Sequence, residues 1–425
     1  ASALTYGASL GALFLAAHIA VRKLAPGADP LLLPLASLLN GLGVVVIRRL
    51  DYGYKVRDPK AAQNAPQQLM WTAIGIAVFV GVLYVVRDHR SLDRYRYTLM
   101  AIGLALLLLP ALPGVGRTIN GARLWVRIGP VSFQPSEISK LALIAFFASY
   151  FVAKREVLSL ATKRILGLHL PRARDLGPVL LAWLASLAVL IQLKDLGTSL
   201  LFFGVFLVML YVATQRTSWL AIGMLLFCGG AYFAYRAFAH VQARFDTWLH
   251  LFADPAGKGF QLTQSLFGLA TGGLTGTGLG RGHPYLVPFA RTDFIFPAIG
   301  EELGLFGVVI VLICYLLIVG RGLRAALGVR DEFGKLLAAG LAFSLALQVF
   351  VVIGGVTRLI PLTGLTLPFL SYGGSSLVAN YALIALLMRI SAAGRTPTPG
   401  PVTPAPGDDQ LSGELTQIVR TGPAR

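Results

Sequence analysis

Long apolar runs separated by short polar stretches make up most of this chain. Several runs continue for about eighteen residues or more before a charged residue, which is long enough for a helix to cross the core of a bilayer. About eleven such helices are expected by length and hydropathy. They are predicted near residues 4–22, 29–48, 69–86, 97–112, 137–153, 176–193, 198–214, 218–236, 299–320, 334–353 and 374–391. The pattern predicts an all-α polytopic membrane protein.

Composition supports a membrane protein. Of the 425 residues, 56% are hydrophobic and only 13% are charged, and the mean hydropathy is +0.71. A soluble protein could not hide this much apolar surface. The formal net charge of +18 would suit a nucleic-acid binder, but the basic residues cluster in short loops and no basic face with interleaved aromatics accompanies them. We therefore expect a membrane and no nucleic acid as partner.

The basic loops indicate how the helices are oriented. Three connections, within residues 87–96, 154–174 and 321–335, are rich in Arg and Lys. Alternating helices place all three on one side, which the positive-inside rule makes cytoplasmic. The basic stretch within 48–60 is then expected outside, against the rule. With a cytoplasmic C-terminus, an odd helix count predicts one further helix ahead of Ala1.

Three longer interruptions share the predicted external face. They are residues 114–136, 237–298 and 354–373. The longest, 237–298, is rich in aromatic and aliphatic residues, so we expect a large ordered extracytoplasmic loop and not a disordered one. Residues 392–425 are rich in Pro, Gly and polar residues and are predicted to form a disordered cytoplasmic tail.

The stretch QPSEISK carries two charges that stand out against an apolar background. Glu137 and Lys140 are three residues apart, so on a helix they share a face and can pair. Two interpretations stay open: a salt bridge that lets both charges sit near the bilayer, or a charged wall of an external cavity. Ser136 is a candidate N-cap of this helix.

Two further polar stretches allow more than one interpretation. In KDLGTSL, Asp195 at a helix junction can cap the next helix or hold a cation. The glycine-rich stretch ATGGLTGTGLGRG lacks the GxGxxG order and a surrounding strand–helix unit, which argues against a dinucleotide site. Its glycines permit tight turns or a close approach of backbone to a ligand. Arg281 is either a solvated loop residue or a phosphate contact.

The stretch PFARTDFIFPAIGEELG places Asp293 beside an apolar run. One interpretation is a helix N-cap. Pro297, Glu301 and Glu302 suggest instead that the helix begins later. A partly desolvated carboxylate has a raised pKa and is a usable base near neutral pH. The residues alone indicate a cavity lined by charged groups and do not identify a substrate.

Six blocks of the chain resemble one family. They are NGARLWVRIGPVSFQPSEISK, DLGTS, RFDTWLHLFADPAGKGFQLTQSL, GGLTGTGLG, TDFIFPAIGEELGLFG and GLTLPFLSYGGSSL. In these blocks, which run from about Asn120 to Ser376, the chain closely resembles the SEDS family, whose RodA and FtsW proteins polymerise peptidoglycan. The stretches DPLLLPLASLLNGLGVVVIRRLD and GGVTRLIPLTGLTLPF are most similar to actinobacterial RodA-type members. The resemblance makes 26–391 the family's membrane domain and 1–25 an additional helix of unknown role.

The resemblance implies a glycosyltransferase of the bacterial plasma membrane that acts on lipid II at the extracytoplasmic face, in cell elongation or division. Asp293 falls on the family's essential aspartate, whose implied role is general base toward the 4-hydroxyl of the acceptor sugar. That oxygen attacks the anomeric carbon of a lipid-linked strand, and undecaprenyl pyrophosphate leaves. Family members also imply a divalent cation, Mg²⁺ or Mn²⁺, with ligands unknown, and a class B penicillin-binding protein as partner.

The resemblance also implies substrate-binding residues around the pyrophosphate and the sugars. These candidates are Arg244, Lys140, Arg123, Arg358, Glu137, Asp195, Trp125 and Ser371. Trp125 can equally serve core packing. Lys194 stands where many members have proline, which leaves the local geometry of Asp195 open.

Two other functions compete with polymerisation. The many helices and buried charges also suit a lipid II flippase, although no inverted repeat with broken helices is evident. A noncatalytic scaffold for wall-synthesis enzymes is the third hypothesis.

Overall fold

The computed structural model describes residues 3–395, apart from residues 120–121, 129–130, 160, 166–167 and most of 172–194. Nine helices in the described part are long and apolar enough to cross a membrane. They are α1 (Ala3–Leu24), α2 (Leu32–Arg57), α3 (Ala65–Val85), α6 (Pro135–Ser159), α8 (Leu196–Thr214), α9 (Thr217–Ala237), α12 (Ile295–Gly328), α13 (Glu332–Val356) and α14 (Gly374–Arg395). The prediction of a polytopic helical membrane protein is confirmed.

The predicted count of eleven spans is not confirmed. Nine predicted spans correspond to the nine long helices. The span predicted near 97–112 is a shorter helix, α5 (Arg96–Leu108), which follows the one-turn α4 (Ser91–Arg94) and continues into the 3₁₀ turn η1 (Leu109–Ala111). The span predicted near 176–193 lies largely outside the described residues, as does the predicted tail beyond Arg395.

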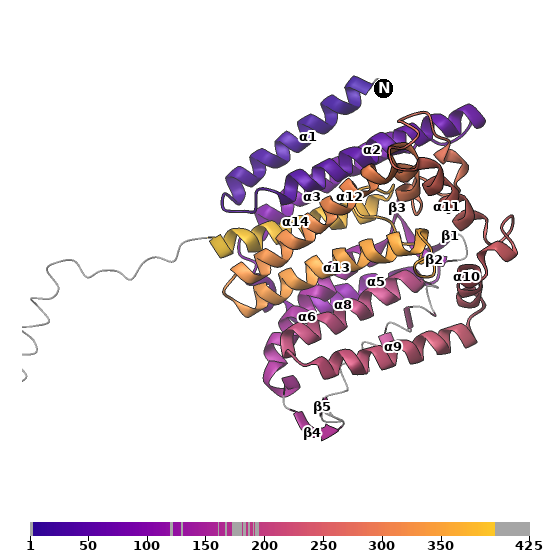
Figure 1. The fold of residues 1–425 in the computed structure, drawn as a ribbon. Coiled ribbons are helices and arrows are strands. Elements are labelled where there is room, and N and C mark those ends of the chain that lie inside the picture. Colours follow the sequence, from indigo (N-terminus) through magenta and orange to yellow (C-terminus); the bar gives the residue numbers. More distant parts are fainter. Residues whose placement is uncertain are drawn as a thin grey trace, which may run out of the picture.

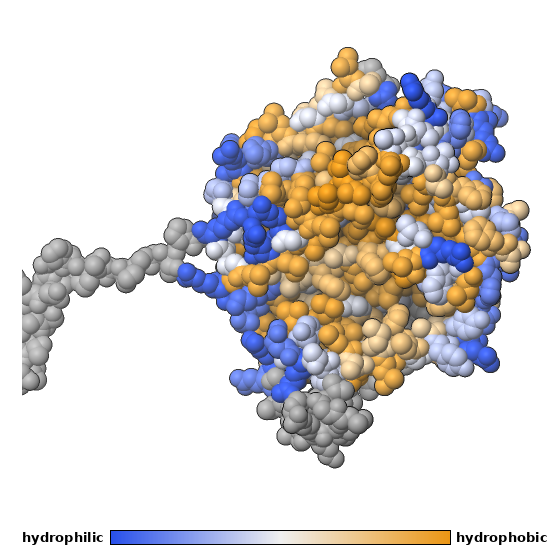
Figure 2. Space-filling model, in the orientation of Figure 1, coloured by the Kyte–Doolittle hydropathy of each residue, from blue (hydrophilic) through white to orange (hydrophobic). Residues whose placement is uncertain are grey.

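The long helices lie side by side, and the short helices, strands and connections gather at the two ends of the bundle (Figure 1). Figure 2 shows an orange apolar band across the middle, with blue polar residues toward both ends. This is the surface that a bilayer requires, because lipid tails cannot hydrate polar groups.

Two small antiparallel sheets accompany the helices. Residues 114–136 contain a small antiparallel sheet of β1 (Gly116–Ile119), β2 (Ala122–Ile128) and β3 (Val131–Phe133), in the order β1-β2-β3. A second antiparallel pair, β4 (Ala161–Ile165) and β5 (Leu168–Pro171), follows α6. The sequence carried the signal in Asn-Gly at 120–121, a dipeptide typical of hairpin turns. A search for long apolar runs cannot detect strands this short.

Residues 237–298 fold into short helices packed at one end of the bundle (Figure 1). These are α10 (Ala239–Leu249), η3 (Leu251–Ala253), α11 (Phe260–Gly272) and η4 (Pro284–Leu286). The glycine-rich stretch after α11 lies against a kink in α12 at Gly304, whose φ is +66°. The carbonyls of Gly273 and Leu274 accept hydrogen bonds from the backbone N–H groups of Leu305 and Phe306 at the kink. The glycines therefore serve a close backbone packing, and Arg281 is exposed.

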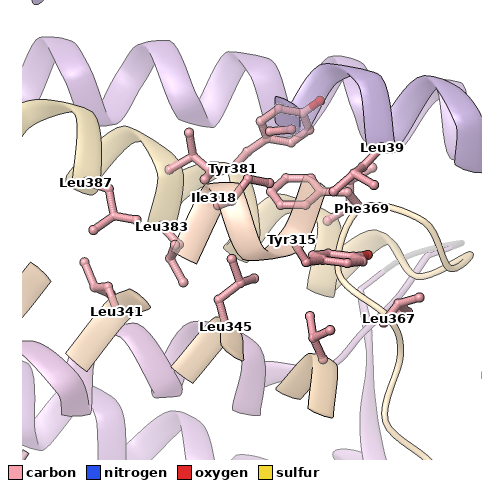
Figure 3. Packing of buried hydrophobic residues seen from close by; sticks show 14 of the residues in the cluster. Leu39, Tyr315, Ile318, Leu341, Leu345, Leu367, Phe369, Tyr381, Leu383 and Leu387 are labelled. Atoms are coloured by element: carbon pink, nitrogen blue, oxygen red, sulfur yellow. The ribbon is translucent and has the colours of Figure 1, made fainter. Parts of the chain in front are cut away.

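The core lies between α12, α13 and α14 (Figure 3). Tyr381 of α14 packs edge-on against Phe79 of α3 and Phe369 of the loop between α13 and α14, with ring centroids 6.4 and 5.4 Å apart. Its hydroxyl accepts a hydrogen bond of 2.8 Å from the Asn40 side chain of α2. Aromatic pairs and a satisfied buried polar group fix the loop 357–373 against the bundle.

The first residues of α3 and α14 lie beside the loop 357–373, at one end of the bundle. α3 begins beside the loop, because the Gln68 side chain donates to the carbonyl of Ser371 over 3.2 Å. α14 begins directly after the loop, at Gly374. Both helices then run to the opposite end of the bundle, where the basic residues Arg389 and Arg395 lie.

Candidate active site

Asp293 lies in a turn that closes just before α12. The backbone N–H groups of Thr292 and Phe294 both donate to the carbonyl of Phe289, which has a positive φ of 56°. α12 begins at Ile295, its cap residue is Phe294, and no side chain caps it. The N-cap interpretation of Asp293 is therefore wrong, and so is the later helix start.

Pro297 explains why the later helix start was wrong. It lies in the first turn of α12, where a backbone N–H has no helical partner to lose. Ser136 is likewise not an N-cap, because α6 begins at Pro135 and Ser136 lies inside it.

Ser371 holds the Asp293 turn against the loop 357–373. Its hydroxyl donates to the carbonyl of Thr292 over 2.6 Å and accepts the N–H of Leu367 over 2.9 Å. Next to it, the N–H of Tyr372 donates to the carbonyl of Arg291 over 2.8 Å. Ser371 thus bonds to the residue before Asp293, which makes it a positioning group in this structure.

Arg244 of α10 lies beside Asp293 and against the loop 357–373. Its Nη1 donates to the carbonyls of Leu362 and Thr363 over 3.0 and 2.8 Å. A Cβ placed on Gly364 would stand 3.8 Å from Nη2 of Arg244 and 3.9 Å from Oδ2 of Asp293. Gly364 is exposed and has a φ of +78°. A side chain at this position would therefore begin in van der Waals contact with both charged groups.

Asp293 has the electrostatics of a base. Burial raises the pKa of Asp293 to about 6, against the opposing effects of a Thr292 hydrogen bond and the charge of Arg244. The side chain is nonetheless partly exposed. Burial also lowers the pKa of Arg244, while Asp195 and Asp293 raise it. A carboxylate with a pKa near 6 is mostly ionised at neutral pH and still binds a proton well.

Asp195 caps α8 and also faces the charge of Arg244. Its Oδ1 accepts the N–H of Thr198 over 3.0 Å, and its other oxygen accepts the Thr198 hydroxyl. The capping interpretation is confirmed. Because Arg244 interacts electrostatically with both Asp195 and Asp293, the cap carboxylate belongs to the same charged cluster.

Glu137 and Lys140 form the predicted pair, and both are buried. Nζ of Lys140 lies 3.0 Å from Oε2 of Glu137 and 2.8 Å from Oε1 of Gln348. Nε2 of Gln348 donates in turn to the carbonyl of Thr366 over 2.9 Å. The pair therefore connects through Gln348 to the loop that carries Gly364.

The other predicted residues lie in structural contacts. Arg358 donates to the carbonyls of Trp248 and Leu249, over 2.9 and 3.0 Å, and Trp248 donates back to the Arg358 carbonyl over 3.1 Å. Arg123 and Trp125 lie on β2, where Nε of Arg123 donates to the carbonyl of Gly116 over 3.4 Å. No contact of these three side chains with Asp293 is found among the described residues.

Sequence reasoning missed Gly364 and Gln348. Gln348 could have been noticed as a lone polar side chain within the apolar run 334–353, since such residues usually face a bundle interior. Gly364 gave no signal of its own, because the loop brings it to Asp293 only in the folded chain.

In the part of the chain that the structure describes, no group of three or more His, Cys, Asp and Glu side chains could hold a metal ion. Mg²⁺ often uses only one or two protein carboxylates and completes its shell with phosphate oxygens and waters. Asp293 and Asp195 could supply such carboxylates, and the remaining ligands would come from a phosphorylated substrate.

Comparisons with known proteins agree on one family. The profile of the FtsW, RodA and SpoVE family, described as cell cycle protein, matches residues 30–396. Peptidoglycan glycosyltransferase RodA of Mycobacterium tuberculosis (strain ATCC 25618 / H37Rv) is 52% identical over 394 residues, covering 92% of this chain and 84% of the relative. Stage V sporulation protein E of Bacillus subtilis (strain 168) is 35% identical over 373 residues, covering 86% and 98%.

Solved structures show the same likeness. The structure described as "Structural coordination of polymerization and crosslinking by a peptidoglycan synthase complex" matches with a TM-score of 0.59 and 26% identity, covering 93% of this chain and 99% of that one. The crystal structure of Thermus thermophilus rod shape determining protein RodA matches with a TM-score of 0.58 and 25% identity, covering 87% and 98%.

Proposed function

The chain belongs to the FtsW, RodA and SpoVE family of cell cycle proteins and is a peptidoglycan glycosyltransferase, and we propose that Asp293 is its general base. The substrate is lipid II, and the product is a glycan strand that stays attached to undecaprenyl pyrophosphate until it is transferred. The end of the bundle that carries Asp293 faces the outside of the plasma membrane.

The reaction is a single displacement. The carboxylate of Asp293 takes the proton of the acceptor 4-hydroxyl while that oxygen forms a bond to the anomeric carbon of the lipid-linked strand. The bond from this carbon to the pyrophosphate oxygen breaks, its electron pair leaves with undecaprenyl pyrophosphate, and the configuration inverts. A positioned base typically contributes about 10²–10⁴-fold to such a step.

One observation carries the assignment: Asp293 is desolvated enough to have a pKa of about 6, yet is partly exposed beside Arg244 and the exposed Gly364. An ordinary exposed aspartate would be a weak base, and a sealed one could not reach a substrate. The space beside Gly364 is where the acceptor hydroxyl would approach.

Positive charge must meet the leaving pyrophosphate. Arg244 supports this role, because the carbonyls of Leu362 and Thr363 orient its guanidinium beside Asp293. A Mg²⁺ or Mn²⁺ ion, when bound, would neutralise phosphate charge. Arg123, Trp125, Arg358 and Lys140 stay candidates for contacts with the longer substrate.

The partner is a class B penicillin-binding protein, a transpeptidase that docks on the membrane helices. The likeness to a peptidoglycan synthase complex that joins polymerisation and crosslinking supports this pairing.

The proposal is tested by polymerisation in vitro. The purified chain with its transpeptidase partner, lipid II and Mg²⁺ is expected to make long glycan, and Asp293→Asn is expected to lose about 10²–10⁴-fold of the rate. Asp246→Asn, a change to an exposed carboxylate of α10, is the matched control and should keep full activity. Equal glycan synthesis by Asp293→Asn would remove Asp293 from the base role.

The same variants separate polymerisation from the competing hypotheses. Labelled lipid II that crosses proteoliposomes equally with the wild type and Asp293→Asn, without polymer, would favour transport. A transpeptidase preparation whose polymerisation is unchanged by adding the chain would favour a scaffold.

A further inference from the structure

A cavity lies at the end of the bundle opposite Asp293. Its volume is about 360 Å³, and it is lined by the segment after α1, the turn after α3 and the end of α14. α3 and α14 both begin beside the loop 357–373, which packs against the Asp293 turn, and both end at this cavity. A full helix length therefore separates the cavity from Asp293. The polymerase mechanism makes no use of this cavity.

Positive charge dominates the lining. Arg87, Arg90 and Arg389 contribute three guanidinium groups, and Asp88 contributes one carboxylate. Asp331 lies nearby and pairs with Arg90 over 3.3 Å and with His89 over 2.9 Å. Arg87 stacks over the ring of Tyr84 at 5.5 Å and has no ion pair with any described residue.

Arg389 is held in place by backbone carbonyls and not by a carboxylate. It donates to Leu24 O over 2.7 Å and to Leu83 O. It therefore covers the carbonyl ends of α1 and α3, which would otherwise repel an anion. Its charge interacts with that of Asp88, but the two form no close ion pair in the described part of the chain, and its Nε is buried and makes no hydrogen bond.

The position of the cavity indicates what kind of anion would bind. Tyr84 and Val85, at the end of α3, are 59% and 77% exposed and continue the apolar surface up to the cavity rim. Guanidinium groups recognise phosphate oxygens in a fork geometry. A phospholipid placed here would set its phosphate against the arginines and its chains along the apolar surface. Basic pockets between membrane helices on the cytoplasmic side are typical sites for anionic head groups.

We propose that this cavity binds the phosphate of an anionic phospholipid from the inner leaflet. The bound lipid would join α1 to the rest of the bundle. α1 ends at Leu24, ahead of the residues 30–396 that match the family. Only Tyr6, Leu10 and Ala17 of α1 are buried, so a ligand at its end would add to the single hydrogen bond by which Arg389 already holds Leu24.

Native mass spectrometry of the full chain tests the proposal with phosphatidylglycerol as the anionic probe and phosphatidylcholine as the zwitterionic one. Arg87→Gln is expected to weaken phosphatidylglycerol binding about fivefold, and Arg87→Gln with Arg90→Gln about 25-fold. Each arginine near the membrane surface contributes about 1 kcal/mol, which is about fivefold in affinity. Arg94→Gln, which changes an exposed arginine at the end of α4 outside the cavity, is the control and should bind as the wild type does.

Arg87→Gln is the decisive variant, because it breaks no ion pair of the described residues that would stabilise the fold. Equal phosphatidylglycerol affinity in the wild type and Arg87→Gln would overturn the proposal, and so would equal binding of the two lipids. Inorganic phosphate is tested as a competitor. If inorganic phosphate binds the wild type as well as phosphatidylglycerol does, the proposal that the bound phosphate belongs to a lipid is refuted. Slower hydrogen exchange in α1 on adding phosphatidylglycerol would support the bridging role.

Discussion

The pH dependence of polymerisation tests the electrostatics of Asp293 directly. Burial raises the pKa of Asp293 from 3.8 to about 6. Because kcat/KM reports the ionisation of the free enzyme, its acidic limb should have a midpoint near pH 6. The base form is then about 0.9 of the enzyme at pH 7 and about 0.1 at pH 5, so the rate falls about tenfold between them.

An unshifted pKa of Asp293 would give a different pH profile. With the ordinary pKa of 3.8, about 0.9 of the carboxylate would still be ionised at pH 5, and the rate would barely change from pH 7. The two cases differ almost tenfold at pH 5, which an assay of glycan formed from labelled lipid II resolves easily.

Arg244→Gln makes the test specific for this site. Arg244 lowers the pKa of Asp293 through its charge, so its removal should raise the pKa and move the acidic limb to higher pH. Arg281→Gln removes an exposed arginine of the same external segment and should leave the midpoint in place. A wild-type midpoint below pH 5, or a limb that Arg244→Gln leaves unmoved or shifts to lower pH, would refute the reasoning.

Three further predictions concern the surroundings of Asp293. Gly364→Ala and Gly364→Val should lower the polymerisation rate, valine more than alanine, because their side chains would occupy the position beside Asp293. Gly364→Asn separates this steric effect from backbone strain, because asparagine tolerates a positive φ. Equal rates of all three variants would contradict the steric explanation. Ser371→Ala removes the hydrogen bond to Thr292 O and should lower kcat with KM little changed. A hydrogen bond of this kind is worth about 0.5–1.5 kcal/mol, so a loss beyond about tenfold would indicate a direct role of Ser371. Lys140→Met leaves Glu137 buried without its partner and should destabilise the protein by about 3–5 kcal/mol, seen as a lower melting temperature. Adding Glu137→Gln should restore most of that loss; no recovery in the double variant would show that Lys140 acts mainly through Gln348.

The sequence alone determined the class of this protein. Apolar runs of spanning length fix where the long helices lie, because a bilayer admits only segments whose backbone is internally hydrogen-bonded. The pairing of Glu137 with Lys140 and the capping by Asp195 were also predictable, since both depend on residues three positions apart. The family resemblance singled out Asp293 before any geometry was known.

Tertiary structure decided which side chains surround that aspartate. Arg244, Gly364 and Ser371 come from α10 and from the loop between α13 and α14, and Asp293 meets them only when these segments pack together. Local pattern carries no record of such contacts, so sequence reasoning grouped Arg358 with Arg244 although their partners differ. The raised pKa of Asp293 has the same origin, because desolvation depends on everything folded around a carboxylate and not on its neighbours in the chain.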